Sequence, residues 1–474
     1  MNEKQASKFE GQLALLYERV NYERQSNAGP RSFKLQTMHD LMQRLGDPHL
    51  AAPVIHIAGT KGKGSVSKMV SEIFREAGFK TGTYSSPHLE RINQRICVNG
   101  EPISDDQFSA TLDQLQPVVD SFDAELAQRG ERGLTFFEIS TACGFQHFAN
   151  ESVDVVVLEV GLGGRLDSTN VCQPDVCVIT NIGLDHVKQL GNTIGAIAGE
   201  KAGIVKAGVP IVNGSLHPEA IETIHRIAGE RHAPLVQLDR DMSTMPNDDG
   251  TFRYQWIGAD DFNVNPTPIE NLVCAMPGEH QIANAGLAIS ACRLFDAQQG
   301  SISDEHIRKG LASATLPGRT EVLSAAPLVM LDMAHNADSI KVLVETFLAK
   351  SASASRTRII LATTREKNTT EIVTPLVAIA DELILTRYQG NPRGEAIEVL
   401  QSVVDQANSA RREQGHSLPQ VVIQDNPITA WQYLADSIEE GDAICITGSA
   451  FLVAELRPEL KRWFYALPAR QCEV

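Results

Sequence analysis

A short apolar run that leads directly into a glycine-rich loop constrains this chain more than any other feature. The run is Val54–Ala58, and the loop consists of Gly59, Thr60, Lys61, Gly62, Lys63, Gly64 and Ser65. The pattern predicts a buried strand, a tight turn and a helix that starts at about Val66. Backbone N–H groups in such a turn, together with the helix N-terminus, form a cradle for phosphate. The loop is therefore predicted to bind ATP, with Lys63 reaching the terminal phosphates and Ser65 facing them or their magnesium.

The spacing of glycines and lysines within this loop limits which kinds of phosphate loop the segment can be. In the usual phosphate loop, four residues separate the first glycine from Gly-Lys-Ser, whereas here the order is Gly-Thr-Lys-Gly-Lys-Gly-Ser. The alternative is a surface turn that carries two solvated lysines. The strand before the loop and the helix after it favour the phosphate site.

The length of the chain indicates how many domains it forms, and its net charge indicates which partners it can bind. The chain has 474 residues, which is long for one hydrophobic core, so two domains are expected. The segment 313–318, which contains Pro317 and Gly318, is the predicted hinge, and the domains are expected to span 1–313 and 314–474. The formal net charge of −17 disfavours a nucleic-acid partner. An acidic protein that handles anions must gather positive charge locally, in a magnesium site or a lysine-lined cleft.

Cysteine usage and hydropathy indicate a reducing, aqueous compartment. The eight cysteines are scattered and none forms a Cys-x-x-Cys pair, so neither a zinc ribbon nor a redox motif is expected. The segment 1–24 is charged and has no apolar core of the signal-peptide kind. No apolar run approaches the ~20 residues of a membrane span. The expected location is the cytoplasm, with no membrane partner.

Apolar runs and helical segments alternate along most of the chain. The valine run at 153–160 predicts a central strand, and further strands are expected at 176–181 and 210–213. Such alternation is typical of a doubly wound, mostly parallel α/β sheet. An antiparallel hairpin is expected within 235–276. Beyond the hinge, apolar runs between 328 and 447 predict a second, smaller α/β domain.

Polar side chains follow two of these strands. Glu159 ends the valine run, and Asp185 and His186 follow the 176–181 run, which is expected to form the neighbouring strand. Ligands of open parallel sheets bind at the carboxyl ends of the strands. A carboxylate there is placed to hold magnesium. The alternatives are a satisfied polar group at a strand end for Glu159, and a packing or surface residue for His186.

Taken together, these residues resemble the Mur ligase superfamily, and most closely its folylpolyglutamate synthase/dihydrofolate synthase family. The resemblance extends from about residue 54 to residue 454 and depends on many ordered blocks. The blocks are 59–65, 85–89, 135–138, 158–167, 185–186, 200–204, 278–281 with 284–285, 317–319 and 332–336. The implied fold is a P-loop sheet like the central domain of Mur ligases, followed by a smaller Rossmann-like domain.

The resemblance implies an ATP-dependent amide ligase of folate biosynthesis. In that reaction the γ-phosphate of ATP passes to a carboxylate, and the amine of L-glutamate attacks the acyl phosphate, so that ADP and phosphate leave. Phosphorylation is needed because a carboxylate is a poor electrophile at neutral pH. The implied acceptors are dihydropteroate, reduced folate (poly)glutamates or both. The 1–313 domain would bind ATP and pterin, and the 314–474 domain would close over ATP and bind glutamate.

The resemblance also implies metal ligands and a modified lysine. Ser86, Glu159 and His186 match magnesium ligands of the family. Lys201 matches a lysine that is carbamylated by CO₂ and would then orient a second magnesium. Carbamylation requires a neutral amine, so burial would have to lower the pKa of Lys201. The alternative is an unmodified lysine that pairs with Glu200 or a phosphate.

The resemblance implies that residues of both predicted domains contact ATP. Asn284 and Arg319 match ATP contacts, and Arg319 is at the predicted hinge. Asp332 and His335 would come from the second domain. The implied catalytic residues are Lys201, Asp167 and His335. A site completed only on closure would protect the acyl phosphate from water.

A pterin pocket is expected where aromatic side chains offer flat stacking faces. The residues implied in this pocket are Thr135, Phe136 and Phe137, with Leu166, Asp167 and Ser168 opposite. Either phenylalanine, taken alone, is better interpreted as a core residue.

Several positions depart from the family pattern. Lys61 stands where the family usually has asparagine, and Met333 and Ala337 replace a glycine and a proline. The segment 363–367 only loosely resembles an Asp-Lys segment. Residues 22–27 read Tyr-Glu-Arg-Gln-Ser-Asn, where well-known bacterial members have an Ile-Asp-Leu-Gly sequence that contacts dihydropteroate. This departure leaves open which pterin is accepted.

Two other functions remain as alternatives. A Mur-type ligase acting on another carboxylate is disfavoured because the N-terminal region is thin and contains no evident UDP-binding domain. A P-loop ATPase or switch module would bind nucleotide without ligation and would need no Lys201, Asp167 or His335. A monomer is expected.

Overall fold

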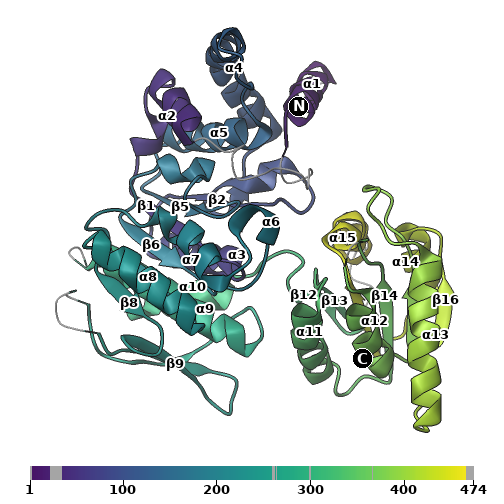
Figure 1. The fold of residues 1–474 in the computed structure, drawn as a ribbon. Coiled ribbons are helices and arrows are strands. Elements are labelled where there is room, and N and C mark those ends of the chain that lie inside the picture. Colours follow the sequence, from purple (N-terminus) through teal and green to yellow (C-terminus); the bar gives the residue numbers. More distant parts are fainter. Residues whose placement is uncertain are drawn as a thin grey trace. The chain divides into compact units, whose positions relative to one another are not determined.

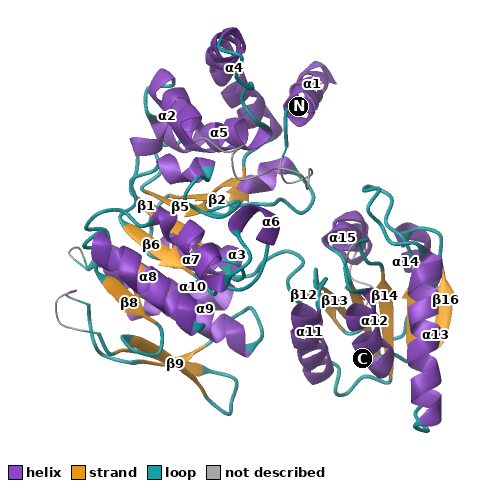
Figure 2. Ribbon diagram, viewed as in Figure 1, coloured by secondary structure: helices purple, strands orange, loops and turns teal. Residues whose placement is uncertain are grey.

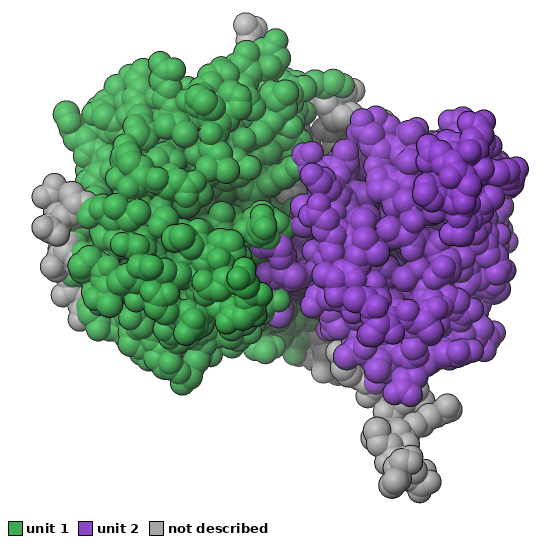
Figure 3. All heavy atoms as spheres, turned by 90° about the horizontal axis from the view of Figure 1, so that it is seen from below, with its two compact units in different colours: residues 1–275, 279–314 green, residues 276–278, 315–474 purple. Residues whose placement is uncertain are grey.

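The computed structural model describes residues 3–21, 35–258, 262, 264–297, 300–365 and 367–465. The chain divides into two compact units, one formed by Met1–Ala275 with Glu279–Ala314 and the other by Met276–Gly278 with Thr315–Val474 (Figure 3). Each unit combines helices with its own sheets (Figure 2). Within the described ranges, every helix is too short or too polar to traverse a bilayer.

The first unit is built on an eight-stranded sheet of order β4-β3-β2-β5-β1-β6-β7-β8. Its strands are β1 (Val54–Ala58), β2 (Thr81–Tyr84), β3 (Ile96–Val98), β4 (Glu101–Pro102), β5 (Val155–Glu159), β6 (Val176–Ile179), β7 (Ile211–Asn213) and β8 (Leu235–Gln237). From β2 to β8 the pairing is parallel, whereas β3 and β4 pair antiparallel at one edge. All residues of β1 are buried, as expected for an interior strand.

Helices surround this sheet (Figure 1). They are α1 (Glu3–Glu18), α2 (Leu35–Arg44), α3 (Lys63–Glu76), α4 (Asp105–Gln128), α5 (Phe136–Asn150), α6 (Val187–Leu190), α7 (Ile194–Lys201), α8 (Pro218–Glu230), α9 (Glu279–Asp296) and α10 (Asp304–Ser313). Residues of α2, α4 and α5 form one apolar cluster with β1 and β5, and residues of α7 and α8 form another with β1 and β6. Helices α3 and α9 pack on each other and on the central strands.

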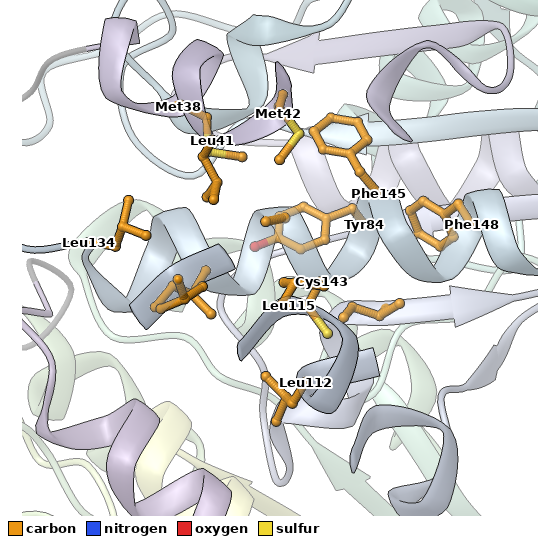
Figure 4. Close-up of a cluster of buried hydrophobic side chains, with 14 of the residues drawn as sticks. Met38, Leu41, Met42, Tyr84, Leu112, Leu115, Leu134, Cys143, Phe145 and Phe148 are labelled. Carbon is orange, nitrogen blue, oxygen red and sulfur yellow. The ribbon is translucent and has the colours of Figure 1, made fainter. Parts of the chain in front are cut away.

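The cluster under α2, α4 and α5 surrounds the ring of Tyr84, which ends β2 (Figure 4). The labelled side chains around it are Met38, Leu41, Met42, Leu112, Leu115, Leu134, Cys143, Phe145 and Phe148. The Tyr84 hydroxyl lies 3.2 Å from both Ser140 Oγ and Thr141 Oγ1, so its polar end is satisfied inside the core. Full burial of each large apolar side chain contributes about 1.5–3 kcal/mol relative to exposure.

A small antiparallel sheet of order β11-β10-β9 completes the first unit. Its strands are β9 (Met242–Pro246), β10 (Phe252–Trp256) and β11 (Ile269–Leu272). Burial alternates along β10, with Phe252, Tyr254 and Trp256 inside. The hairpin expected within 235–276 is present, and a third strand extends it.

The second unit contains a six-stranded sheet of order β12-β13-β17-β14-β15-β16. Its elements are β12 (Glu321–Ala325), β13 (Leu328–Leu331), α11 (Ala337–Lys350), β14 (Arg356–Leu361), α12 (Thr369–Ile379), β15 (Glu382–Leu385), α13 (Ile397–Glu413), β16 (Gln420–Ile423), α14 (Pro427–Ala435), β17 (Asp442–Thr447) and α15 (Ala450–Tyr465). All pairs are parallel except β12 with β13.

The doubly wound sheet and the second α/β unit are confirmed, with corrections of detail. Helix α3 begins at Lys63 rather than near Val66, because Gly62 adopts a left-handed φ of 92° and turns the chain into the helix three residues earlier. The antiparallel strand β12 was not expected from the sequence pattern. The departure at residues 22–27 lies outside the described residues.

Candidate active site

The loop after β1 is held by the segment that follows β6. The Thr60 N–H donates to the Asn181 carbonyl at 2.9 Å, and the Thr180 hydroxyl donates to the Lys61 carbonyl at 2.7 Å. Gly59 lies against the same threonine, and a Cβ at this position would be 1.7 Å from Thr180 Oγ1. Close packing alone therefore requires glycine at 59. Contacts within the protein therefore hold the shape of this loop.

The end of this loop meets α9. At Gly62 a Cβ would lie 2.7 Å from Asn284 Oδ1, and the Asn284 amide in turn donates to Gln281 Oε1 at 3.0 Å. The structure thus brings Asn284 to the loop from a distant part of the chain. Gly64 and Ser65 form the first turn of α3, where the helix N-terminus favours an anion.

Two lysines meet at the carbonyl oxygen of Gly59. Lys63 Nζ donates to it at 3.2 Å and Lys201 Nζ at 2.8 Å. Lys201, the last residue of α7, is 5% exposed. Burial, followed by the charge of Lys63, lowers the pKa of Lys201 to about 7, although the carboxylates of Asp185 and Asp167 act in the opposite direction. A substantial fraction of neutral amine therefore exists near neutral pH.

The predicted metal ligands all lie at or beyond the carboxyl ends of strands of the large sheet. Ser86 follows β2 and Glu159 ends β5, and these two strands are neighbours. Glu159 is buried. The expectation that His186 follows the strand beside that of Glu159 is wrong, because β1 lies between β5 and β6. In the sheet, β1 therefore separates β5 and β6, although these two strands are consecutive in the sequence.

His186 is also more open than the other two. Its side chain is 56% exposed, its φ is 48°, and its Nε2 lies 3.9 Å from Asp185 Oδ1. In the described part of the chain, no group of three or more His, Cys, Asp or Glu side chains is gathered as a metal site. The hydroxyl and carboxylate oxygens of Ser86 and Glu159 are nevertheless of the kind that bind hard divalent cations, whereas the imidazole of His186 is a softer donor.

Asp167 organises the loop that follows Glu159. Its carboxylate accepts the Leu162 N–H at 2.8 Å, and the N–H and hydroxyl of Thr169 at 3.0 and 2.5 Å. Burial raises the pKa of Asp167, and these hydrogen bonds oppose that effect. The loop packs on the Lys201 segment so closely that a Cβ at Gly164 would lie 2.8 Å from the Lys201 carbonyl oxygen.

The residues predicted around a pterin occupy different environments. Leu166 and Ser168 are partly exposed, whereas Thr135 is buried and caps α5 by accepting the Glu138 N–H at 3.2 Å. Asp167, on the same loop, is buried as described above.

The two neighbouring phenylalanines separate into different roles. Phe136 is fully buried, its ring stacks on Tyr17 with centroids 5.5 Å apart, and the Arg95 guanidinium lies 5.2 Å from the ring centre. Phe136 is therefore a core residue in this structure, since no face of it is open to stack on a heterocycle. Phe137 is partly exposed and lies against Gly161, where a Cβ would be 2.5 Å from its Cζ. Phe137 is thus the ring that meets the 161–167 loop.

In the second unit, Asp332 joins two segments that carry predicted site residues. Its carboxylate accepts the N–H groups of Thr320 and Ala334, each at 2.7 Å, which ties the segment after Arg319 to the segment before His335. Burial raises the pKa of Asp332, and the Thr320 N–H and the Arg319 charge act against it. His335 Nδ1 lies 2.9 Å from the Met333 carbonyl, which assigns a hydrogen to Nδ1.

Two features of the second unit were missed from the sequence. Glu321 accepts the Gly318 N–H at 2.7 Å and pairs with Arg457 at 2.7 Å, and so holds the turn that carries Arg319. Nothing in the sequence distinguishes this glutamate from other edge-strand acids. The second feature is a group of buried hydroxyls after β14, β15 and β17, in which Thr364 Oγ1 lies 2.9 Å from the Tyr388 hydroxyl and 3.2 Å from Ser449 Oγ. Hydroxyl residues that follow apolar runs were the available signal.

Comparisons with known proteins show which family this chain resembles. Residues 57–292 match the Mur ligase middle domain, and residues 318–450 match the Mur ligase glutamate ligase domain. Dihydrofolate synthase/folylpolyglutamate synthase of Bacillus subtilis is 36% identical over 430 residues, which cover 90% of this chain and 95% of that protein.

Two solved structures extend the comparison. FolC of Escherichia coli in complex with DHPP and ADP superposes with a TM-score of 0.77 at 28% identity, over 95% of this chain and 98% of that one. Bifunctional folylpolyglutamate synthase/dihydrofolate synthase of Yersinia pestis, complexed with AMPPNP and a Mn ion, gives a TM-score of 0.75 at 29% identity, over 95% and 98%.

The fold and these matches define an ATP-dependent ligase of the Mur ligase type. More particularly, the chain belongs to the folylpolyglutamate synthase/dihydrofolate synthase family. The resemblance drawn from the sequence blocks is therefore confirmed.

Proposed function

We propose that this chain uses ATP to join L-glutamate to dihydropteroate, to reduced folate (poly)glutamates or to both. The γ-phosphate activates the acceptor carboxylate as an acyl phosphate, the glutamate amine attacks it, and ADP and phosphate leave. The observation that carries this proposal is the convergence of Lys63 and Lys201 on the Gly59 carbonyl of the phosphate loop. A ligase must bring an anionic carboxylate to an anionic phosphate, and the positive charge of Lys63 and of magnesium reduces that repulsion.

Each amine has a separate task in this proposal. Lys63, at the N-terminus of α3, and the loop N–H groups hold the nucleotide phosphates. Lys201 is carbamylated by CO₂, for which its burial and its lowered pKa are favourable. An unmodified Lys201 that contacts phosphate directly is the alternative.

Ser86, Glu159 and His186 are proposed to hold a magnesium ion together with nucleotide phosphate oxygens. The ion would neutralise phosphate charge and polarise the transferred phosphoryl group. Two magnesium ions are proposed in all, the second beside the carbamate of Lys201. The Mn ion of the Yersinia pestis complex supports the use of a divalent metal in this family.

The units are proposed to divide the substrates between them. The 1–313 domain binds ATP and the pterin, the latter through Leu166, Asp167 and Ser168 with Phe137 nearby. The 314–474 domain supplies Arg319, Asp332 and His335 to the nucleotide and binds glutamate. The buried hydroxyls of Thr364 and Ser449 support a polar ligand site at the carboxyl edge of its sheet.

A cytoplasmic monomer is proposed for the protein as a whole. Free thiols support a reducing compartment, since none of the seven cysteines within the described ranges is in a disulfide. Sedimentation of the purified protein would test the monomer.

Phosphate release tests the activity. The purified protein is incubated with ATP, magnesium and glutamate, in parallel with dihydropteroate and with tetrahydrofolate. Release that requires both glutamate and one pterin identifies that step, and release with both pterins identifies a bifunctional enzyme. Release without glutamate dependence would favour an ATPase module, and none with either pterin would favour another carboxylate substrate. Lys63→Ala is expected to abolish release, while the exposed Lys188→Ala leaves it unchanged.

A further inference from the structure

His56 is a fully buried histidine in the interior strand of the large sheet. Its register partners are Leu158 of β5 and Cys177 of β6, both apolar in environment. Val54 and Ala58, on the same face of β1, belong to two different apolar clusters, so His56 stands between those clusters. Burial of a polar ring at this point is costly unless its nitrogens are hydrogen-bonded.

Both ring nitrogens have partners around the 3₁₀ helix Ser168–Val171. His56 Nε2 lies 2.9 Å from Thr169 Oγ1, and His56 Nδ1 lies 3.4 Å from Cys172 Sγ. The Thr169 hydroxyl lies 2.5 Å from Asp167 Oδ1, and the other oxygen of that carboxylate accepts the Leu162 N–H at 2.8 Å. A continuous chain of hydrogen bonds thus runs from the interior strand to the 161–167 loop.

The number of hydrogens that each group can donate determines which atom donates in each of these hydrogen bonds. The hydroxyl of Thr169 has one hydrogen, and it donates that hydrogen to the Asp167 carboxylate. His56 must then donate its Nε2–H to Thr169 Oγ1, which leaves Nδ1 as an acceptor for the Cys172 thiol. Burial supports this order, because it lowers the pKa of His56 to about 3 and raises the pKa of the Cys172 thiol.

We propose that His56 and Thr169 are positioning residues that orient the Asp167 carboxylate and thereby the 161–167 loop. The loop is sensitive to this orientation because it packs without spare room. A Cβ at Gly161 would meet Phe137, and a Cβ at Gly164 would meet the Lys201 carbonyl oxygen. The same series of hydrogen bonds also anchors the 161–167 loop to β1, the strand that leads into the phosphate loop.

This inference rests on the proposed function for its kinetic test, since Asp167 and its neighbours are there assigned to the pterin. Thr169→Val keeps the shape of the side chain and removes the hydroxyl, whereas Thr169→Ser keeps the hydroxyl. We expect Thr169→Val to raise the KM for the pterin substrate by about tenfold or more while the KM for ATP stays within about twofold. Thr169→Ser is expected to restore the wild-type KM for the pterin.

Three kinetic outcomes would overturn the proposal. The first is an unchanged KM for the pterin in Thr169→Val. The second is an equal rise of both KM values, which a distortion of the whole site would produce. The third is a Thr169→Ser variant as impaired as Thr169→Val, since shape rather than the hydroxyl would then matter.

A second measurement is made on the intact wild-type chain and does not depend on turnover. Nitrogen NMR of histidine-labelled protein, with the His56 signal assigned by its loss in His56→Gln, reports which ring nitrogen carries hydrogen. A neutral ring with hydrogen on Nε2 is expected at neutral pH. A charged His56 ring, or hydrogen on Nδ1, would contradict the proposed order of hydrogen bonds. If the wild type turned over neither pterin, the proposed function would fail while this result still decided the proton order.

Discussion

Lys63 and Lys201 share one hydrogen-bond acceptor, the carbonyl oxygen of Gly59, at distances of 3.2 and 2.8 Å. One lysine follows the strand that leads into the phosphate loop, and the other ends a helix far along the chain. Burial and the charge of Lys63 both oppose the protonation of Lys201, and an anion bound beside the two amines would relieve this cost. The stability of the ligand-free protein should record this cost.

The first prediction concerns Lys201→Met. The folded-state pKa of Lys201 is about 7, below the ordinary value of 10.5, so the unfolded chain binds one more proton between these pH values. Wild-type stability therefore rises with pH through this window, and the cost of the buried lysine is fully present below pH 7. We expect Lys201→Met to raise the free energy of unfolding by roughly 2 kcal/mol near pH 6.5. The gain should shrink toward pH 10.

Urea unfolding without nucleotide, at several pH values, measures this gain. The Gly59 carbonyl keeps Lys63 as a donor in the variant, so no acceptor is left unpaired. Lys188→Met, at an exposed lysine, serves as the control and should show no such trend. A stability difference that stayed constant with pH would speak against a depressed lysine pKa.

The second prediction concerns Gly59→Ala. The added methyl group would lie 1.7 Å from Thr180 Oγ1 and 2.9 Å from Thr180 Cβ, so the loop must move. We expect ATP-dependent turnover to be lost and the free energy of unfolding to fall by about 1–3 kcal/mol. Gly229→Ala is the matched control, since a Cβ there meets nothing within 4 Å. Thermal unfolding and the KM for ATP measure both variants, and equal behaviour would remove the packing argument.

The third prediction concerns Lys61, which stands where the family usually has asparagine. Its side chain is exposed, so its attraction for nucleotide phosphates acts through solvent and is screened by salt. We expect Lys61→Asn to raise the KM for ATP by about two- to fivefold at low ionic strength. The difference should vanish near 1 M salt, where the Debye length is about 3 Å. A rise in KM independent of salt would point instead to a shape effect in the loop.

The fourth prediction concerns Asp442 in the second unit. It faces Arg356 across β14 and β17 at 3.0 Å and the buried Arg358 at 3.3 Å. Burial alone would raise the pKa of Asp442, but hydrogen bonds from Arg356 and the Glu439 N–H outweigh it and hold the pKa below its usual range. The stability that Asp442 contributes is therefore present above its unfolded pKa and is lost as pH falls through the lower folded pKa.

We expect Asp442→Asn to lower the free energy of unfolding at pH 7 by about 3 kcal/mol, because Arg358 loses part of its compensation. The difference from wild type should disappear under strongly acidic conditions. Asp405→Asn, at an exposed position of α13, is the control and should change the stability by less than about 0.5 kcal/mol. Denaturant unfolding at pH 7 and at a pH well below 3.8, the ordinary pKa of an aspartate, makes the comparison. An effect of equal size at both values would argue against the ionised form as the stabilising one.

The sequence by itself determined the units whose structure is local. The strand–loop–helix at the phosphate loop, the alternation of strands and helices, and the ordered family blocks follow from short-range patterns of apolar residues and glycine. Family membership followed from those blocks, because many ordered motifs together are specific. What a motif does locally could be predicted; which motifs meet could not.

Only the tertiary structure determined which motifs are in contact, because these contacts depend on strand order and on packing between distant segments. In the folded sheet β1 lies between β5 and β6, and so separates the strand that ends at Glu159 from the strand that precedes His186. The tertiary structure packed Phe136 into the core and left Phe137 beside the 161–167 loop. It also brought Lys201 to Gly59. Neither apolar periodicity nor residue spacing records such contacts, since each is set by the competition of whole elements for burial.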